Sequence, residues 1–242
     1  MAAKSGHSRR QFLLAGTATG TGLVITGFAG VTKAADNATQ PKSVVQTAED
    51  IAPPEDLMRE HGVLNRILLI YEECLQRLQG QKNLDPAPLA SSAKIISTFI
   101  EDYHEKLEED QLFPRFEKAG KLVDLVKVLR EQHQAGRRLT GEIIRLATPA
   151  TLKDATGTKK LSTSITQFIR MYRPHEARED TILFPAIRSL MTAKEFDELG
   201  DRFEDKEHEL FGEHGFEDIV ARVAEFEKSL GIYDLSQFTP KP

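Results

Sequence analysis

The sequence predicts an all-α protein, built as an up-down-up-down four-helix bundle with a helical C-terminal extension. Two observations support this fold class. Apolar residues recur every three or four positions through four long segments within residues 54–191, which is the period of a helix with one buried face. Short breaks containing Gly or Pro separate these segments, so consecutive helices are expected to run antiparallel.

The composition is that of a globular protein that can bury a proper core. The chain has 242 residues, of which 40% are hydrophobic and 29% charged, and its formal net charge is −5. These values favour one domain with appendages. No basic block lies in the folded part, which excludes nucleic acid as a partner. The sequence contains no phosphate-binding loop, dinucleotide fingerprint or Ser/His/Asp triad, and it does not indicate a protein partner.

Residues 1–34 are typical of a twin-arginine (Tat) export signal. Arg9 and Arg10 precede an uncharged run from Phe12 to Val31, which ends at small residues. A membrane anchor is the alternative, because the run is almost long enough to cross a bilayer. Its many Gly and Thr residues weaken that alternative. We expect a bacterial protein exported to the periplasm, with no membrane span after cleavage.

The first helix follows a polar segment, residues 35–53, that we expect to be a disordered linker. Pro53 and Pro54 end the linker, and the helix is expected from about Glu55 to Gln79. Its buried stripe contains Leu57, His61, Leu64, Leu68, Tyr71, Leu75 and Leu78. Cys74, the single cysteine of the chain, excludes an intramolecular disulfide and is expected to be a small packed side chain.

The second and third helices are separated at Gly120. The second is expected after a loop at residues 80–88, and Pro114 marks either its kink or its end. The inward face of the second helix contains Ile96, Ile100, His104, Leu107, Glu108 and Gln111. The inward face of the third contains Leu122, Val126, Leu129, His133, Thr140 and Ile144.

The fourth helix is expected after a turn-rich break at residues 148–160, and Pro174 is expected to bend it. Its inward face contains Ile165, Phe168, Tyr172, His175, Glu179 and Ile182. A helical extension at residues 192–231 follows, with a capping box at Thr192 and Glu195 and an interruption at Gly215. Residues 232–242 form a tail. We expect His208 and His214, both in the extension, to be solvated.

An eleven-residue phrase occurs twice, as HEKLEEDQLFP at 104–114 and as HEAREDTILFP at 175–185. In each copy a Glu follows the His by four residues, so both side chains stand on the same helix face. His61 precedes His133 by 72 residues and His104 precedes His175 by 71, so the first two helices correspond to the last two. The repeat predicts two half-sites, which are His61 with His104 and Glu108, and His133 with His175 and Glu179.

This set of residues predicts a metal site. Any one of the histidines could be an ordinary core residue, but a buried carboxylate costs several kcal/mol unless it is paired or bound to a cation. Four imidazoles and two carboxylates without a thiolate argue against Cu(I), iron–sulfur clusters and calcium. They suit iron better than manganese or zinc. Six ligands exceed the usual four of one structural zinc. Two metals bridged by Glu108 and Glu179 are therefore expected.

These motifs resemble those of bacterial hemerythrin-like domains of the HHE cation-binding type. The resemblance covers about residues 54–191 and includes Arg59-Glu60-His61 and both Leu-Phe-Pro sequences. It implies a non-haem pair of iron ions with an oxo or hydroxo bridge, and O₂, peroxide or NO as the small molecule that the centre meets.

The sequence departs from oxygen-carrying hemerythrins at Arg137, where those proteins have a further histidine. The ligands expected here and one bridging group supply about ten bonds, whereas two octahedral irons need about twelve. Glu105 and Glu176, next to ligand histidines, are candidates for extra ligands, although both could be surface residues or partners of ligands. Arg137 could face a bound anion or the solvent. Tyr103 and Tyr172 are candidate hydrogen-bond donors near the ligands.

Three functions remain open from the sequence. The first is a di-iron protein that binds, senses or reacts with O₂, peroxide or NO, and that would be an oxidoreductase if it is an enzyme. The second is an iron-binding protein that buffers the metal without turnover. The third is a metal-free helical bundle whose extension recruits a partner.

Overall fold

The computed structural model describes residues 51–80 and 82–240. It confirms the all-α bundle, since the described residues form helices and no strand. From Ala52 onward the chain is one compact unit. The export signal predicted at residues 1–34 and most of the linker predicted at residues 35–53 lie outside the described residues.

The first helix, α2 (Pro53–Gln79), begins two residues earlier than expected. Ala52 precedes it with an extended backbone, which is the conformation that a following proline favours. Proline at the first helical position costs no hydrogen bond, because that N–H would have no partner within the helix. The predicted stripe faces inward, with Leu57, Leu64 and Tyr71 at most 1% exposed.

Each of the four long helical paths of the bundle is called a rod here, and α2 is the first. The second rod consists of five consecutive helical segments. These are α3 (Pro86–Ile95), η2 (Ile96–His104), α4 (Glu105–Leu107), η3 (Glu108–Leu112) and α5 (Phe113–Ala119). The rod starts at Pro86, so the loop predicted to extend to Pro88 is shorter. The carboxylate of Asp85 caps it by accepting the N–H of Ala87 at 2.9 Å. Gly120 ends the rod in the left-handed conformation, with φ 63°.

Both copies of the repeated phrase contain a turn of π-helix that begins at the glutamate. In η3 the N–H of Phe113 donates to the carbonyl of Glu108, and in η4 (Glu179–Leu183) the N–H of Phe184 donates to that of Glu179. The proline after each Phe lacks an N–H and its ring would crowd the carbonyl four residues back, which the wider turn accommodates. Pro114 therefore does not end the helical path, because α5 continues it.

The π turns shift the buried face of each rod by about one residue. Ile182, predicted to face inward, is 42% exposed, whereas Leu183 and Phe184 are fully buried. Gln111, also predicted inward, is only partly buried, and Leu112 and Phe113 take its place. Both errors come from extending a period of 3.6 residues through a wider turn.

The third and fourth rods pack side by side. The third is α6 (Val123–Leu146), and the fourth contains α8 (Ala155–Arg178), η4, α9 (Phe184–Ile187) and η5 (Arg188–Leu190). The turn-rich break predicted at residues 148–160 is wrong for most of its length. A short helix, α7 (Pro149–Leu152), occupies part of it, and α8 begins at Ala155 because Asp154 caps the N–H groups of Thr156 and Gly157.

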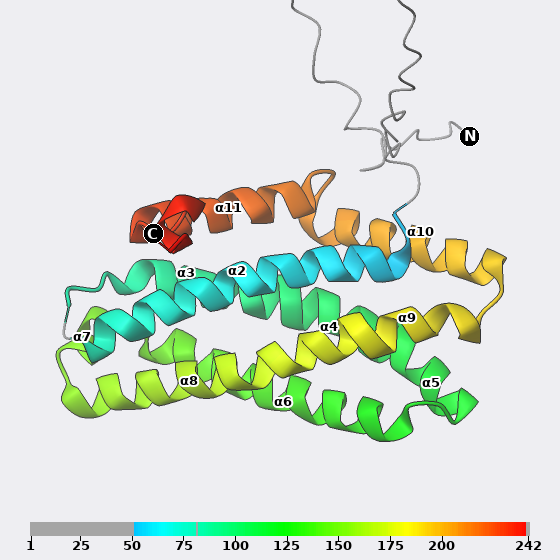
Figure 1. The fold of residues 1–242 in the computed structure, drawn as a ribbon, viewed down its shortest axis with the longest axis horizontal. Coiled ribbons are helices and arrows are strands. Elements are labelled where there is room, and N and C mark those ends of the chain that lie inside the picture. Colours follow the sequence, from blue (N-terminus) through cyan, green and yellow to red (C-terminus); the bar gives the residue numbers. More distant parts are fainter. Residues whose placement is uncertain (1–50, 81, 241–242) are drawn as a thin grey trace, which may run out of the picture. The chain divides into compact units, whose positions relative to one another are not determined.

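The C-terminal extension lies along the outside of the bundle (Figure 1). It consists of α10 (Ala193–Phe211) and α11 (Gly215–Leu230), followed by the short turn η6 (Leu235–Phe238) in the predicted tail. The predicted capping box of Thr192 and Glu195 is present. Both helices pack on α2, and α11 also packs on α3. His214 is exposed as expected, but His208 is partly buried and its Nε2 is covered.

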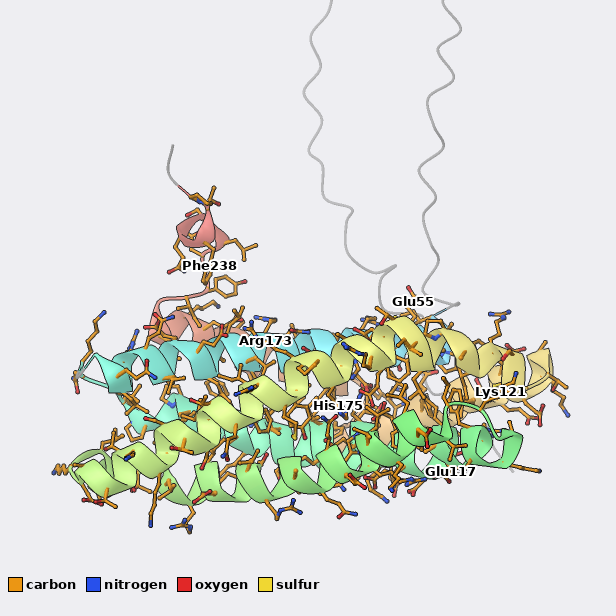
Figure 2. All side chains as sticks on the ribbon, turned by 60° about the horizontal axis from the view of Figure 1, so that its bottom comes forward. Glu55, Glu117, Lys121, Arg173, His175 and Phe238 are labelled. Atoms are coloured by element: carbon orange, nitrogen blue, oxygen red, sulfur yellow. The ribbon has the colours of Figure 1, made fainter. Side chains whose placement is uncertain are left out.

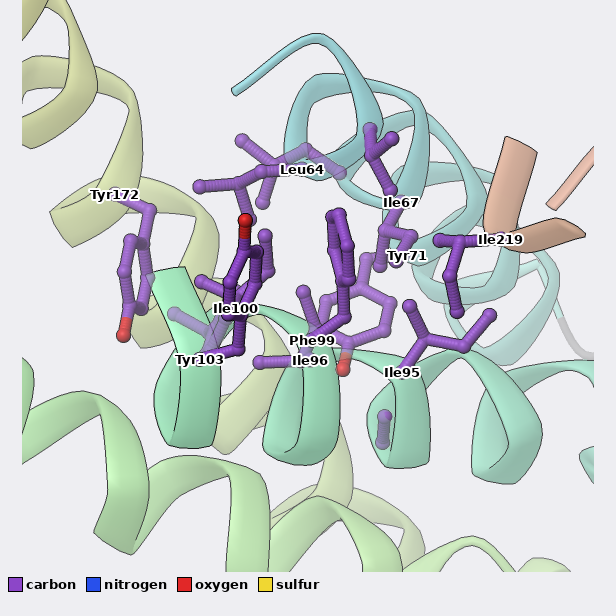
Figure 3. Close-up of a cluster of buried hydrophobic side chains, with 14 of the residues drawn as sticks. Leu64, Ile67, Tyr71, Ile95, Ile96, Phe99, Ile100, Tyr103, Tyr172 and Ile219 are labelled. Atoms are coloured by element: carbon purple, nitrogen blue, oxygen red, sulfur yellow. The ribbon is translucent and has the colours of Figure 1, made fainter. Parts of the chain in front are cut away.

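The apolar core continues from the bundle into the extension. Figure 3 shows Leu64, Tyr71 and Phe99 packed together, with Ile219 of α11 at the edge of the cluster. Cys74 is fully buried, and burial raises the pKa of its thiol to about 12. Among the described residues, no helix is both long and apolar enough to cross a membrane.

Candidate metal centre

All four rods of the bundle contribute side chains to one buried polar cluster. The six residues predicted as ligands are each at most 3% exposed. Figure 2 shows His175 inside the bundle, while the labelled charged residues lie on its outside. The cluster contains two groups whose nitrogen and oxygen atoms lie within 4.8 Å of one another, and these are His61 with His104 and Glu108, and His133 with His175 and Glu179. These are the two half-sites that the repeat predicts.

The two carboxylates lie between the groups. Glu179 Oε2 is 3.1 Å from Nε2 of His175 in its own group and 3.4 Å from Nε2 of His61 in the other. Glu108 Oε2 is 3.8 Å from Nε2 of His104 and 3.4 Å from Nε2 of His133. Each glutamate therefore faces nitrogens of both half-sites, as a bridging carboxylate must.

The unsatisfied polar atoms of this cluster fit a cation. Neither oxygen of Glu108 or of Glu179 makes a hydrogen bond, nor does Nε2 of His133, although all three residues are completely buried. Buried polar groups that make no hydrogen bond are rare in folded proteins because they lose their hydration without full compensation. A metal ion accepts electron pairs from all of these atoms, which suits a set of imidazole and carboxylate donors.

Each of the four histidines forms a hydrogen bond through Nδ1 with a side chain that is not one of the six proposed ligands. His61 donates to Asp180 at 2.7 Å and His133 to Glu109 at 3.0 Å. In the same way, Nδ1 of His104 lies 2.8 Å from Glu60 and Nδ1 of His175 lies 2.9 Å from Gln132. A proton held at Nδ1 leaves the electron pair of Nε2 free, and such bonds orient imidazoles that bind metals.

These four acceptors were missed in the sequence, although the repeat contains them. Glu60 and Gln132 directly precede the lone histidines, and Glu109 and Asp180 directly follow the two glutamates. Each acceptor serves a histidine on another rod, so helical spacing within one rod cannot reveal it. The offset of 71 or 72 residues that relates the ligands also relates the members of each pair.

Protons partly neutralise the cluster in the metal-free chain. Burial opposes protonation of His61, but the hydrogen bond to Asp180 and the charge of Glu179 outweigh burial and raise the pKa of His61 to about 10. Burial lowers the pKa of His133 to about 4. Burial and the charge of Glu179 raise the pKa of Glu108 well above its usual range. A cation that binds here would therefore displace protons.

Arg137 and Glu105 lie behind His133, on the side of its Nδ1. Glu105 Oε2 is 3.9 Å from that nitrogen, and the guanidinium of Arg137 lies 2.9 Å from both Glu105 Oε2 and Glu109 Oε1. The guanidinium of Arg137 therefore forms ion pairs with two carboxylates of the protein itself. Tyr172 donates a hydrogen bond to Glu105 Oε1 at 2.7 Å. Burial raises the pKa of Glu105 to about 8, although Tyr172 and Arg137 oppose the shift.

Of the two remaining candidates, Glu176 lies beside the cluster, whereas Tyr103 is directed elsewhere. Glu176 accepts a hydrogen bond from Asn65 at 3.0 Å, and burial raises its pKa to about 7. The hydroxyl of Tyr103 is 3.5 Å from Glu207 Oε2, on α10 of the extension. Tyr103 therefore faces the extension and not the ligand carboxylates.

Comparison with known proteins agrees with this site. The family model of the hemerythrin HHE cation binding domain matches residues 52–187, more than half of the chain, and matches again at residues 124–231. Uncharacterized proteins from Mycobacterium bovis and from two strains of Mycobacterium tuberculosis are each 53% identical to the chain over 202 residues. The aligned part covers 83% of this chain and 79% of each relative. No solved structure matches the chain. The chain belongs to the hemerythrin HHE cation-binding domain family.

Proposed function

We propose that the chain holds two iron ions between Glu108 and Glu179 and binds, senses or reacts with O₂, peroxide or NO. The observation that carries this proposal is the pair of buried carboxylates whose four oxygens make no hydrogen bond while facing imidazoles of both half-sites. Iron bound there would supply one-electron redox chemistry and coordination positions for a small ligand. The chain itself supplies six ligands, the four acceptors behind the histidines and a shell that excludes water.

The same observation weighs against a metal-free bundle. In a metal-free core, apolar residues at these positions would be more stable, because a buried pair of carboxylates without hydrogen bonds costs free energy. Burial also weighs against buffering of iron. A buffer must exchange its metal with solvent, whereas all six proposed ligands are at most 3% exposed. A small uncharged molecule can penetrate such a shell more readily than a hydrated cation can leave it.

Metal analysis and spectroscopy test the proposal. The full chain should contain two irons after expression with export intact, and its oxidised form should show an absorption band of a bridged ferric pair. We expect this band to change when peroxide is added, or when the reduced protein meets O₂ or NO. Iron that is present but silent towards all three molecules would favour buffering, and a chain without metal would favour the metal-free bundle.

We also propose export through the Tat pathway, on the basis of the twin arginines in the sequence. Replacing Arg9 and Arg10 with Lys keeps the charge but should retain the protein in the cytoplasm. Cell fractionation measures the outcome. Unchanged export of the double variant would contradict this route.

A further inference from the structure

We infer that the C-terminal extension is part of the metal centre, because Glu207 of α10 positions Glu60, the carboxylate that holds His104. This inference rests on the proposed function and extends it to a region outside the four rods. Glu207 is here a positioning residue that acts through Glu60. It would tune the half-site formed by His61, His104 and Glu108.

The geometry places the two glutamates in one buried cluster. Glu60 and Glu207 are both 0% exposed. One carboxylate oxygen of each, together with one of Asp56, lies within 4.8 Å of the others. Glu60 Oε2 in turn lies 2.8 Å from Nδ1 of His104. Carboxylates of α10 and α2 therefore lie close together behind a proposed ligand on η2.

The carboxylate of Glu207 is held in place by two other elements. Its Oε1 accepts the backbone N–H of Phe216 at 2.9 Å, at the start of α11. Its Oε2 lies 3.5 Å from the hydroxyl of Tyr103 on η2. Gly215 allows the close approach, since a Cβ at this position would lie 2.7 Å from Cβ of Phe211 and 3.0 Å from Glu207 Oε1. The fold of the extension thus determines where the charge of Glu207 lies.

A fixed negative charge beside Glu60 has a predictable effect on His104. Charges interact strongly in a buried, weakly polarisable environment. The charge of Glu207 makes Glu60 a stronger acceptor for the Nδ1 proton of His104. A stronger acceptor makes the imidazole a better donor to a metal. The second match of the family model, residues 124–231, includes α10 and α11, so the extension itself resembles sequences of this family.

Substitution of Glu207→Gln tests the inference. A glutamine has the same shape, and its carbonyl can still accept the N–H of Phe216, so the cap of α11 is kept while the charge is removed. Fe(II) should be titrated anaerobically into the full chain in competition with a chromophoric chelator. We expect about three- to tenfold weaker binding of one of the two ions, and about 10- to 100-fold for Glu60→Gln. In the double variant the substitution of Glu207 should add nothing.

Glu227→Gln is the matched control. Glu227 is also a buried glutamate of the extension bonded to α2, but its partner is Arg66, at 2.9 Å. This variant should change thermal stability and leave Fe(II) affinity as in the wild type. An equal loss of affinity in both variants, no loss in Glu207→Gln, or full additivity with Glu60→Gln would overturn the inference.

A second readout separates this inference from the proposed function. In the metal-free, ¹⁵N-labelled chain, the Nδ1–H proton resonance of His104 should move upfield in Glu207→Gln and stay in place in Glu227→Gln. If the wild-type chain binds no iron but the resonance still moves in Glu207→Gln, the proposed function is contradicted and the positioning by Glu207 is supported. A chain that binds two irons but shows neither the shift nor the change in affinity would contradict only the inference.

Discussion

The two half-sites have the same set of proposed ligands but different surroundings. In the first, His61 and His104 bond to the carboxylates of Asp180 and Glu60. In the second, His175 bonds to the neutral amide of Gln132. The acceptor of the other histidine there, Glu109, also bonds to Arg137, whose positive charge partly offsets that of the carboxylate. The repeat thus preserved the proposed ligands while the layer behind them diverged.

This difference predicts two unequal metal positions. A carboxylate behind an imidazole makes it a stronger donor than an amide does, and a guanidinium on that carboxylate reduces the effect. The first half-site should therefore bind its ion more tightly and hold it at a lower reduction potential. A two-step metal titration would follow from this asymmetry, although both ions would share Glu108 and Glu179 in the proposed site.

The largest expected effect is the loss of metal from both half-sites at once. Glu108→Ala should lose both ions, because this carboxylate faces imidazoles of both half-sites, whereas His61→Ala or His133→Ala should each lose one. Metal content per chain measures the outcome. Glu117→Ala, which removes an exposed glutamate of α5, is the control and should keep both ions. Full metal content in Glu108→Ala would show that the bridging assignment is wrong.

The next effect would make the half-sites more alike. Gln132→Glu places a carboxylate behind His175 at nearly constant volume, and it should tighten binding at the second half-site by about tenfold. Asp180→Asn should weaken the first by about 10- to 100-fold. Chelator competition measures both affinities. If the difference between the two steps survives both substitutions, the acceptors behind the histidines are not its cause.

A smaller effect concerns the packing that supports the second half-site. A Cβ at Gly136 of α6 would lie 1.9 Å from the hydroxyl of Tyr172, so Gly136→Ala should displace Tyr172 from Glu105. We expect a loss of about 1–3 kcal/mol in the free energy of unfolding, measured with urea.

Gly141→Ala is the matched control on the same helix. A Cβ at Gly141 meets no atom within 4 Å, so alanine should stabilise α6 by up to about 1 kcal/mol. Equal effects of the two substitutions would mean that the contact of Gly136 with Tyr172 does not restrict the packing.

The smallest expected effect is a pH dependence of the metal-free protein. The pKa of Glu105 is raised to about 8 from an ordinary value near 4.5. The unfolded chain therefore loses this proton more readily, and stability is complete below the ordinary pKa and falls as pH rises towards 8. We expect Tm to fall between pH 5 and 8, and to fall by less in Glu105→Gln. An identical fall in that variant would exclude Glu105 as its source.

The helices and the six proposed ligands could be predicted because each depends on spacing along one helix. His61 on an apolar stripe, or Glu108 four residues after His104, can be recognised without knowing any neighbour. One error arises where a local rule does not hold: a regular period places Ile182 inward, but the π turn at Glu179 interrupts that period. The start of α8 follows a local rule, because Asp154 is an N-cap and α8 begins directly after it.

The sequence alone determined the all-α bundle and the two groups of imidazole and carboxylate side chains in its core, because these follow from periodicity and from a repeat within the chain. Tertiary structure alone decided which acceptor stands behind each histidine, where Arg137 lies and how Glu207 of the extension reaches Glu60. The physical reason is that a hydrogen bond between rods depends on the rotation and register of both. Neither is encoded in the spacing of residues along one of them.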